Sequence, residues 1–161
     1  AMEVPADTFR DPLPMAVAIQ ADLKAVGLQV KIETYEWNTY LAKVNAGLPP
    51  QVQMAEMAWM TNDPDTLPFL TLRSDALPDQ GGFNSGYYHN PEVDRLLQQA
   101  RLTTDNASRA TLYRQVQQIV HQDAPWIFVA NWKQNAVTST RIDHFTLQPN
   151  FNLLLNRVTK H

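Results

Sequence analysis

The 161-residue sequence contains no cysteine, which excludes a disulfide framework, a thiolate metal site and a cysteine nucleophile. It also has no apolar run near the roughly 20 residues that a membrane-spanning helix needs, and residues 1–10 lack the basic start and apolar middle of a secretion signal. Positive charge is in the minority, because 13 Lys and Arg stand against 16 Asp and Glu and leave a net charge of −3. We therefore expect neither nucleic acid nor an anionic membrane surface as a partner.

Catalytic and metal-binding motifs are missing as well. The sequence has no G-x-S-x-G nucleophile elbow, no G-x-x-x-x-G-K-[ST] phosphate loop, no G-x-G-x-x-G turn and no H-E-x-x-H helix. The histidines, at positions 89, 121, 144 and 161, do not have the spacing of metal ligands. We expect no metal site, no cofactor and no catalytic residue.

The spacing of the apolar residues predicts an α/β fold. The length and the 44% hydrophobic content suit one domain. In the first half, helical spacing at 12–26 and 37–44 alternates with strand-like segments at 28–32 and 51–59. Because a helix that joins two strands makes a right-handed crossover, we expect these strands to form a parallel pair.

Further along the chain the same patterns predict more helices, short strands and an irregular tail. The expected helices cover 64–72, 91–102 and 107–121, with a long loop at 74–89 after the first of them. We expect the last two helices to lie antiparallel and to cover the sheet. Alternating apolar residues predict strands at 126–132, 135–139 and 145–147, whereas the tail at 149–161 has apolar residues without a useful period.

The most informative segment is the run 59–65, which leaves the second predicted strand and enters a helix. A strand end that feeds a helix N-terminus offers backbone N–H donors and a helix dipole, here beside a large aromatic ring. Tryptophan is also common in protein cores, so a structural role for the run stays open. The candidate ligand contacts are its first five residues: Trp59, Met60, Thr61, Asn62 and Asp63.

Two aspartates of this run have structural alternatives. Asp65 lies in the first turn of the predicted helix, where negative charge contributes about 0.3 to 1 kcal/mol, so we interpret it as a capping residue. Asp63 could cap the same helix or meet a ligand cation. The loop at 74–89 adds a second candidate lining in Asn84, Ser85 and Tyr87, although Tyr87 could instead pack the loop against the following helix.

The order of these segments resembles the C-terminal part of the family 5 solute-binding proteins of ABC importers, the dipeptide, oligopeptide, nickel and glutathione binding group. The segments that carry the resemblance are 18–28, 36–40, 59–65, 86–97 and 109–126. The resemblance implies the C-terminal lobe of a two-lobed, periplasmic-binding-protein-like class II fold. Residues 1–148 would form this second ligand-binding lobe, and the tail at 149–161 would return to the absent first lobe.

The resemblance also implies a function without chemistry. Such a protein closes two lobes around a small solute, such as a peptide, an opine, glutathione or a metal chelate, and delivers it to ABC permease subunits. It works in the periplasm or, as an anchored lipoprotein, outside a Gram-positive cell, and its signal peptide would lie outside this fragment. Contact with the membrane would occur only through the permease.

The match to the peptide-binding members is incomplete. In those members a strand-end Trp precedes a loop Asp that pairs with the peptide amino group, followed by an acidic residue and Pro. Here Trp59 and Asp63-Pro64 match, but the intervening 60–62 is shorter and holds no carboxylate. A free α-amino group would then lose a charge-assisted hydrogen bond worth on the order of 1.5 to 3 kcal/mol, unless Asp63 takes that role.

Two other classes of function stay open. A hydrolase could use Asp63 with His89, which requires the two groups to lie within about 3 Å or to share a water. A protein-interaction module could dock on a partner through the apolar tail, which would give concentration-dependent self-association of the isolated chain.

Overall fold

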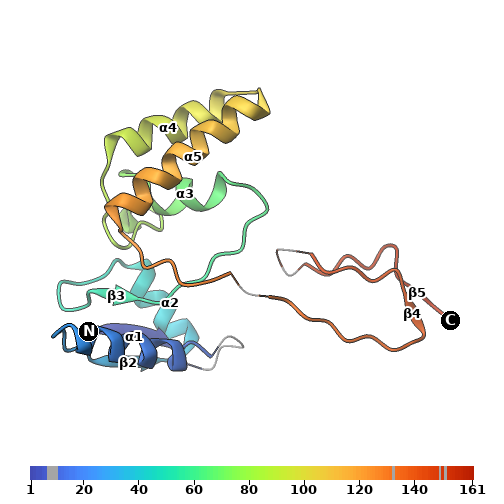
Figure 1. Cartoon of the computed structure of the whole chain (residues 1–161), viewed down its shortest axis with the longest axis horizontal. Coiled ribbons are helices and arrows are strands. Elements are labelled where there is room, and N and C mark those ends of the chain that lie inside the picture. The colour runs from blue at the N-terminus through green and yellow to red at the C-terminus, as the bar shows by residue number, and fades with distance from the viewer. Residues whose placement is uncertain (7–10, 132, 149, 151) are drawn as a thin grey trace.

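A computed structural model describes residues 1–6, 11–131, 133–148, 150 and 152–161 of the chain. Its first part is a parallel sheet of three strands, β1 (Met2–Pro5), β2 (Ile32–Tyr35) and β3 (Met54–Ala55), in the order β2-β1-β3. Figure 1 shows this sheet with the helices α1 (Leu13–Ala25) and α2 (Trp37–Asn45) beside it. The expected parallel arrangement is confirmed, but β1 lies between the two strands that the sequence predicted as direct neighbours.

Both predicted strands are shorter in the structure than their apolar patterns suggested. Residue 28 does not begin a strand, because the Leu28 N–H donates to the Leu23 carbonyl and closes the C-terminal turn of α1 around Gly27, whose φ is +89°. Beyond β3 the Glu56 N–H still donates to the Glu3 carbonyl, and the Glu56 carbonyl accepts the Tyr40 hydroxyl from α2. The ladder therefore ends soon after β3.

The sheet has its own small core. Met2 and Val4 of β1 pack with Ala16 of α1, and the partly buried Val30, Ile32 and Met54 close around them. Glu36 caps α2 by accepting the N–H groups of Asn38 and Thr39, which starts the helix directly after β2.

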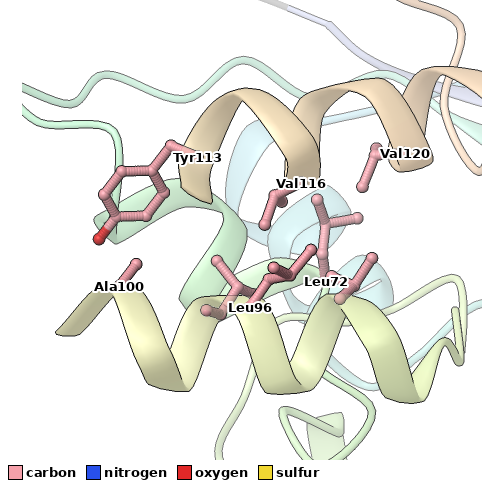
Figure 2. Close-up of a cluster of buried hydrophobic side chains, with 8 residues drawn as sticks. Leu72, Leu96, Ala100, Tyr113, Val116 and Val120 are labelled. Atoms are coloured by element: carbon pink, nitrogen blue, oxygen red, sulfur yellow. The ribbon is translucent and has the colours of Figure 1, made fainter. Parts of the chain in front are cut away.

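Two longer helices form a second core. Asn90 caps helix α4 (Pro91–Leu102), since its side chain accepts two backbone N–H groups, and Asp105 caps α5 (Asn106–Asp123) by accepting one. Their buried stripes face each other and enclose Leu72, as Figure 2 shows. The buried members of this core are Leu72, Val93, Leu96, Leu97, Ala100, Tyr113, Val116 and Val120.

The prediction that these two helices cover the sheet is wrong. Their core shares no residue with the core of the sheet, and Figure 1 shows the pair stacked over α3 (Thr66–Thr71) rather than on the strands. The apolar stripes predict an apolar partner surface, and each helix supplies that surface to the other.

The segment after α5 differs most from the sequence prediction. In the part of 124–161 that the structure describes, the strands are β4 (Ile142–Asp143) and β5 (Thr159–Lys160), which pair antiparallel. The strands predicted at 126–132, 135–139 and 145–147 do not form there, since the alternating side chains have no neighbouring strand and Ile127, Phe128 and Val129 are exposed. Trp132 lies outside the described residues.

No helix in the described ranges is long and apolar enough to cross a membrane.

Candidate functional site

The run 59–65, called here the 59–65 turn, follows β3 after residues 56–58 and leads into α3. Trp59 is partly buried, and its ring meets the Phe83 ring edge to face, with centroids 5.2 Å apart and planes at 76°. Met60 is exposed beside it, and the Thr61 hydroxyl donates to the Asp63 carbonyl. The turn therefore presents an apolar and aromatic surface at its start.

Asp63 caps α3. One carboxylate oxygen accepts the N–H groups of Asp65 and Thr66 at 2.8 and 2.9 Å, and the other accepts the Thr66 hydroxyl at 2.8 Å. The Thr66 hydroxyl and N–H hold the pKa of the Asp63 carboxyl below its usual value. Of the two roles that the sequence left open for Asp63, the structure shows the capping role.

The interpretation of Asp65 as a capping residue is wrong. Its side chain makes no cap hydrogen bond, and only 9% of its surface is exposed. Its carboxylate instead accepts Nε of Arg101 at 2.9 Å and the hydroxyl of Tyr113 at 2.9 Å. Because Asp63 already serves the donors at the start of α3, the Asp65 carboxylate is available for partners elsewhere in the fold.

Asn84 lies in the loop 83–87, called here the 83–87 loop, and is only 2% exposed. Its amide nitrogen donates to the carbonyls of Arg73 and Tyr88 at 3.0 and 2.8 Å, and its amide oxygen accepts the Tyr88 N–H at 2.9 Å. Ser85 is 9% exposed, and its carbonyl accepts the Leu48 N–H. These two predicted contacts therefore shape the loop.

Tyr87 is exposed and has a positive φ of 54°. Its ring lies over Gly47, where any side chain would collide with the phenol, and Gly47 itself has a φ of +90°. Tyr87 thus packs on the turn after α2, and the alternative packing on the following helix is not the one observed. The Trp59–Phe83 contact, by contrast, brings the two predicted linings together.

Several residues that lie around the turn were not predicted from the sequence. Phe83 was one apolar residue in a polar loop, and its pairing with Trp59 depends on the path of the chain. Tyr113 could have been found, since it continues the buried stripe of Val116 and Val120 one turn earlier and its hydroxyl needs a partner there. The role of Arg101 could not be predicted from the helical pattern, since it is a charged residue outside the apolar stripe of its helix.

The 59–65 turn exposes groups that can contact a ligand, namely the Met60 thioether and the Asn62 amide beside the partly buried Trp59 ring. In the described part of the chain, no group of three His, Asp or Glu side chains could hold a metal ion. The Asp63 carboxylate is bonded to Asp65 and Thr66, and His89 is exposed in the segment before α4, so the described residues give the Asp63–His89 hydrolase pair no geometric support. Two open grooves lie elsewhere, one between α4 and α5 and one between α1 and β2.

Comparison with known proteins agrees with this fold. Residues 2–79 match the bacterial extracellular solute-binding proteins, family 5 middle region. The chain is 41% identical over 119 residues to the dipeptide-binding protein of Escherichia coli, which covers 73% of this chain and 21% of that protein. It is 33% identical over 141 residues to heme-binding protein A of Haemophilus influenzae, which covers 86% of this chain and 25% of that protein.

Solved structures give the same result. The chain matches the periplasmic binding protein DppA of Helicobacter pylori in complex with the peptide STSA, with a TM-score of 0.65 and 35% identity over 77% of this chain and 24% of that one. The dipeptide-binding protein of Pseudoalteromonas in complex with Met-Leu matches with a TM-score of 0.69 and 25% identity, over 99% of this chain and 32% of that one. The chain thus spans only about a fifth to a third of the length of these relatives.

Both comparisons bear on the α/β lobe of a periplasmic-binding-protein-like fold that the sequence predicted, and they confirm it. The matched range 2–79 includes the sheet, α1, α2 and the whole 59–65 turn. The chain belongs to the bacterial extracellular solute-binding proteins of family 5.

Proposed function

We propose that this chain forms one wall of the solute cleft in the substrate-binding component of an ABC importer. The observation that carries the proposal is the Trp59–Phe83 pair with exposed Met60 beside it, in the segment that connects β3 to α3 in a lobe of this family. An exposed apolar surface at the end of a strand is what a small-molecule cleft needs on one side. The members of the family bind and deliver solutes, and we propose that this chain likewise performs no chemistry.

Within this wall, the predicted contacts divide into two groups. Trp59, Met60, Thr61 and Asn62 supply an apolar face and neutral hydrogen-bonding groups, and we propose that these touch the solute. Asp63, Asn84 and Ser85 hold the shape of the turn and the loop through their own hydrogen bonds. Tyr87, at the end of the loop, packs its ring on Gly47.

The solute class follows from the same surface. The Asp63 carboxylate already accepts the Asp65 N–H and the N–H and hydroxyl of Thr66, and the Asp65 carboxylate is held by Arg101 and Tyr113, so both carboxylates of the 59–65 turn have partners within the chain. Relatives carry names that include dipeptide, glutathione and deoxycholate binding. We propose a small peptide-like solute that contacts Trp59 through a part other than its amino group.

We further propose how the rest of the protein completes the cleft. A second lobe would close over the 59–65 turn, and the tail at 149–161 would return to that lobe. The exposure of Leu153, Leu154 and Leu155 supports this, because three neighbouring apolar side chains gain from a partner surface. The whole protein would act outside the cytoplasmic membrane and present its solute to ABC permease subunits.

The experiment uses the full-length parent protein. Its melting temperature and tryptophan fluorescence are followed against a panel of dipeptides, tripeptides, glutathione, opines and metal chelates, since a solute that binds only the folded state raises the melting temperature. With a solute identified, Trp59→Ala weakens its binding by about 1 to 3 kcal/mol, the amount expected for a lost aromatic wall.

Trp37→Ala is the matched control, because Trp37 is another partly buried Trp in an aromatic pair, stacked on Tyr40 at 6.1 Å between centroids. It should lower stability and leave the affinity unchanged. If Trp59→Ala also lowers stability without changing affinity, Trp59 belongs to the core and the proposed wall is wrong.

A further inference from the structure

We propose that Asp65 is a positioning residue, which fixes the 59–65 turn against the α4–α5 pair through Arg101 and Tyr113. These three residues are called here the Asp65 cluster. The inference rests on the proposed function for its meaning, because the turn matters only if it contacts a solute. The geometry of the cluster stands independently of that function.

Two different helices hold the Asp65 carboxylate. Nε of Arg101, at the end of α4, lies 2.9 Å from one oxygen, and the hydroxyl of Tyr113, in α5, lies 2.9 Å from the other. These partners are 36 and 48 positions away in the sequence. Asp65 is the last residue of the turn. The cluster therefore ties the turn to a helical core whose helices come later in the sequence.

Arg101 makes a second contact with the same part of the chain. Its guanidinium lies 3.3 Å from the centroid of the Phe69 ring in α3, and the guanidinium of Arg73 lies 4.1 Å from that centroid. A planar guanidinium can pair with a carboxylate and stack on a ring at once, which an ammonium group cannot do equally well. Arg101 therefore holds both the end of the turn and the helix that follows it.

The C-terminal end of helix α3 is held by Leu72, which is buried in the α4–α5 core, and by the Leu70 carbonyl, which accepts the Phe83 N–H. The helix spans six residues, and Thr71 is the buried residue among them. Its N-terminal donors are served locally by Asp63, which fixes the start of the helix but not its direction relative to α4 and α5. Asp65 and its two partners thus tie the N-terminal end of α3, where the chain arrives from Trp59, to α4 and α5.

The test must separate positioning from plain stabilisation, and the chain offers a matched pair of variants. Tyr113→Phe removes a phenol hydroxyl that donates to the Asp65 carboxylate. Tyr88→Phe removes a phenol hydroxyl that donates to the Asp123 carboxylate at 2.5 Å, and Tyr88 packs against the same helical core. The two changes are chemically identical, but only Tyr113 is linked to the 59–65 turn.

Both variants are made in the full-length parent, and amide hydrogen exchange is measured at residues 59–66. Tyr113→Phe should speed exchange there by roughly tenfold relative to its effect on the rest of the chain, the factor expected for one lost hydrogen bond to a charged group. Tyr88→Phe should leave 59–66 unchanged. Arg101→Lys keeps the charge but removes the planar guanidinium that stacks on the Phe69 ring. It should speed exchange at 59–66 as Tyr113→Phe does.

Solute affinity is measured on the same proteins. Tyr113→Phe should weaken binding several-fold and Tyr88→Phe should not. Equal exchange at 59–66 in both tyrosine variants, or faster exchange with unchanged affinity, overturns the positioning role. If no solute binds even the unsubstituted parent, the proposed function fails, while the exchange result still decides whether the Asp65 cluster fixes the turn.

Discussion

Replacement of Asn84 by Ala tests whether this buried amide has a structural role or a ligand-binding role. The substitution removes three hydrogen bonds, two donated to the carbonyls of Arg73 and Tyr88 and one accepted from the Tyr88 N–H. Since Asn84 is only 2% exposed, water reaches these backbone groups poorly in its absence. An unsatisfied buried group costs about 1 to 3 kcal/mol, and with partial entry of water we expect a total loss of about 2 to 4 kcal/mol.

The assay is urea denaturation of the chain, followed by circular dichroism, with the free energy of unfolding compared at an unchanged m-value. Asn62→Ala is the control, because Asn62 is an exposed residue of the turn and its loss should change stability by less than about 0.5 kcal/mol. A loss below about 1 kcal/mol for Asn84→Ala would refute this reasoning. A ligand role would instead show as lost solute affinity in the parent protein with stability intact.

The other predictions concern packing, backbone conformation and pH. Gly47→Ala should lower the stability to thermal unfolding more than Gly27→Ala does, since both glycines have a φ near +90° but only Gly47 has a tyrosine ring against it. We expect Gly27→Ala to lower the free energy of unfolding by about 1 to 2 kcal/mol. Leu97→Ala should cost about 2 to 5 kcal/mol in the same assay, and the exposed Leu102→Ala less than about 0.5. The hydroxyl of Tyr88 donates to the Asp123 carboxylate and lowers the pKa of that carboxyl. The ionised Asp123 carboxylate therefore contributes its full stabilisation above the unfolded pKa of about 3.9, and this stabilisation is lost as pH falls through the lower folded pKa. Melting temperatures between pH 2 and 6 should therefore fall less in Asp123→Asn than in the unsubstituted chain, and an equal fall in both would contradict this assignment.

The helices were predictable because their information is local. Asn90-Pro91 starts α4 as a cap followed by proline, and the stripe from Val93 to Ala100 fits the buried face that the structure shows. Strand β1 could not be predicted in the same way, since four residues carry no usable period and their burial comes from two strands far along the chain. The long predicted strand at 51–59 failed for a related reason, because an apolar run indicates burial and does not state which groups will pair with its backbone.

The candidate site was predictable as a segment and not as a set of roles. The turn after a strand, with its Trp and its two aspartates, was visible in the sequence. Which aspartate caps α3 was not, because a cap at Asp63 and a cap at Asp65 satisfy the same local pattern. The deciding contacts come from Arg101 and Tyr113, and only the packing of α4 on α5 brings those side chains to Asp65.

The position of the 59–65 turn depends on both cores of the chain. On one side, β3 belongs to the sheet, whose buried cluster contains Met2, Val4 and Ala16. On the other side, Asp65 is bound by residues of α4 and α5, whose buried cluster is separate. A change in either core can therefore move the turn without touching it. A substitution deep in the α4–α5 pair that lowers solute affinity, with Trp59 and its neighbours intact, would be explained by this connection and not by a direct contact.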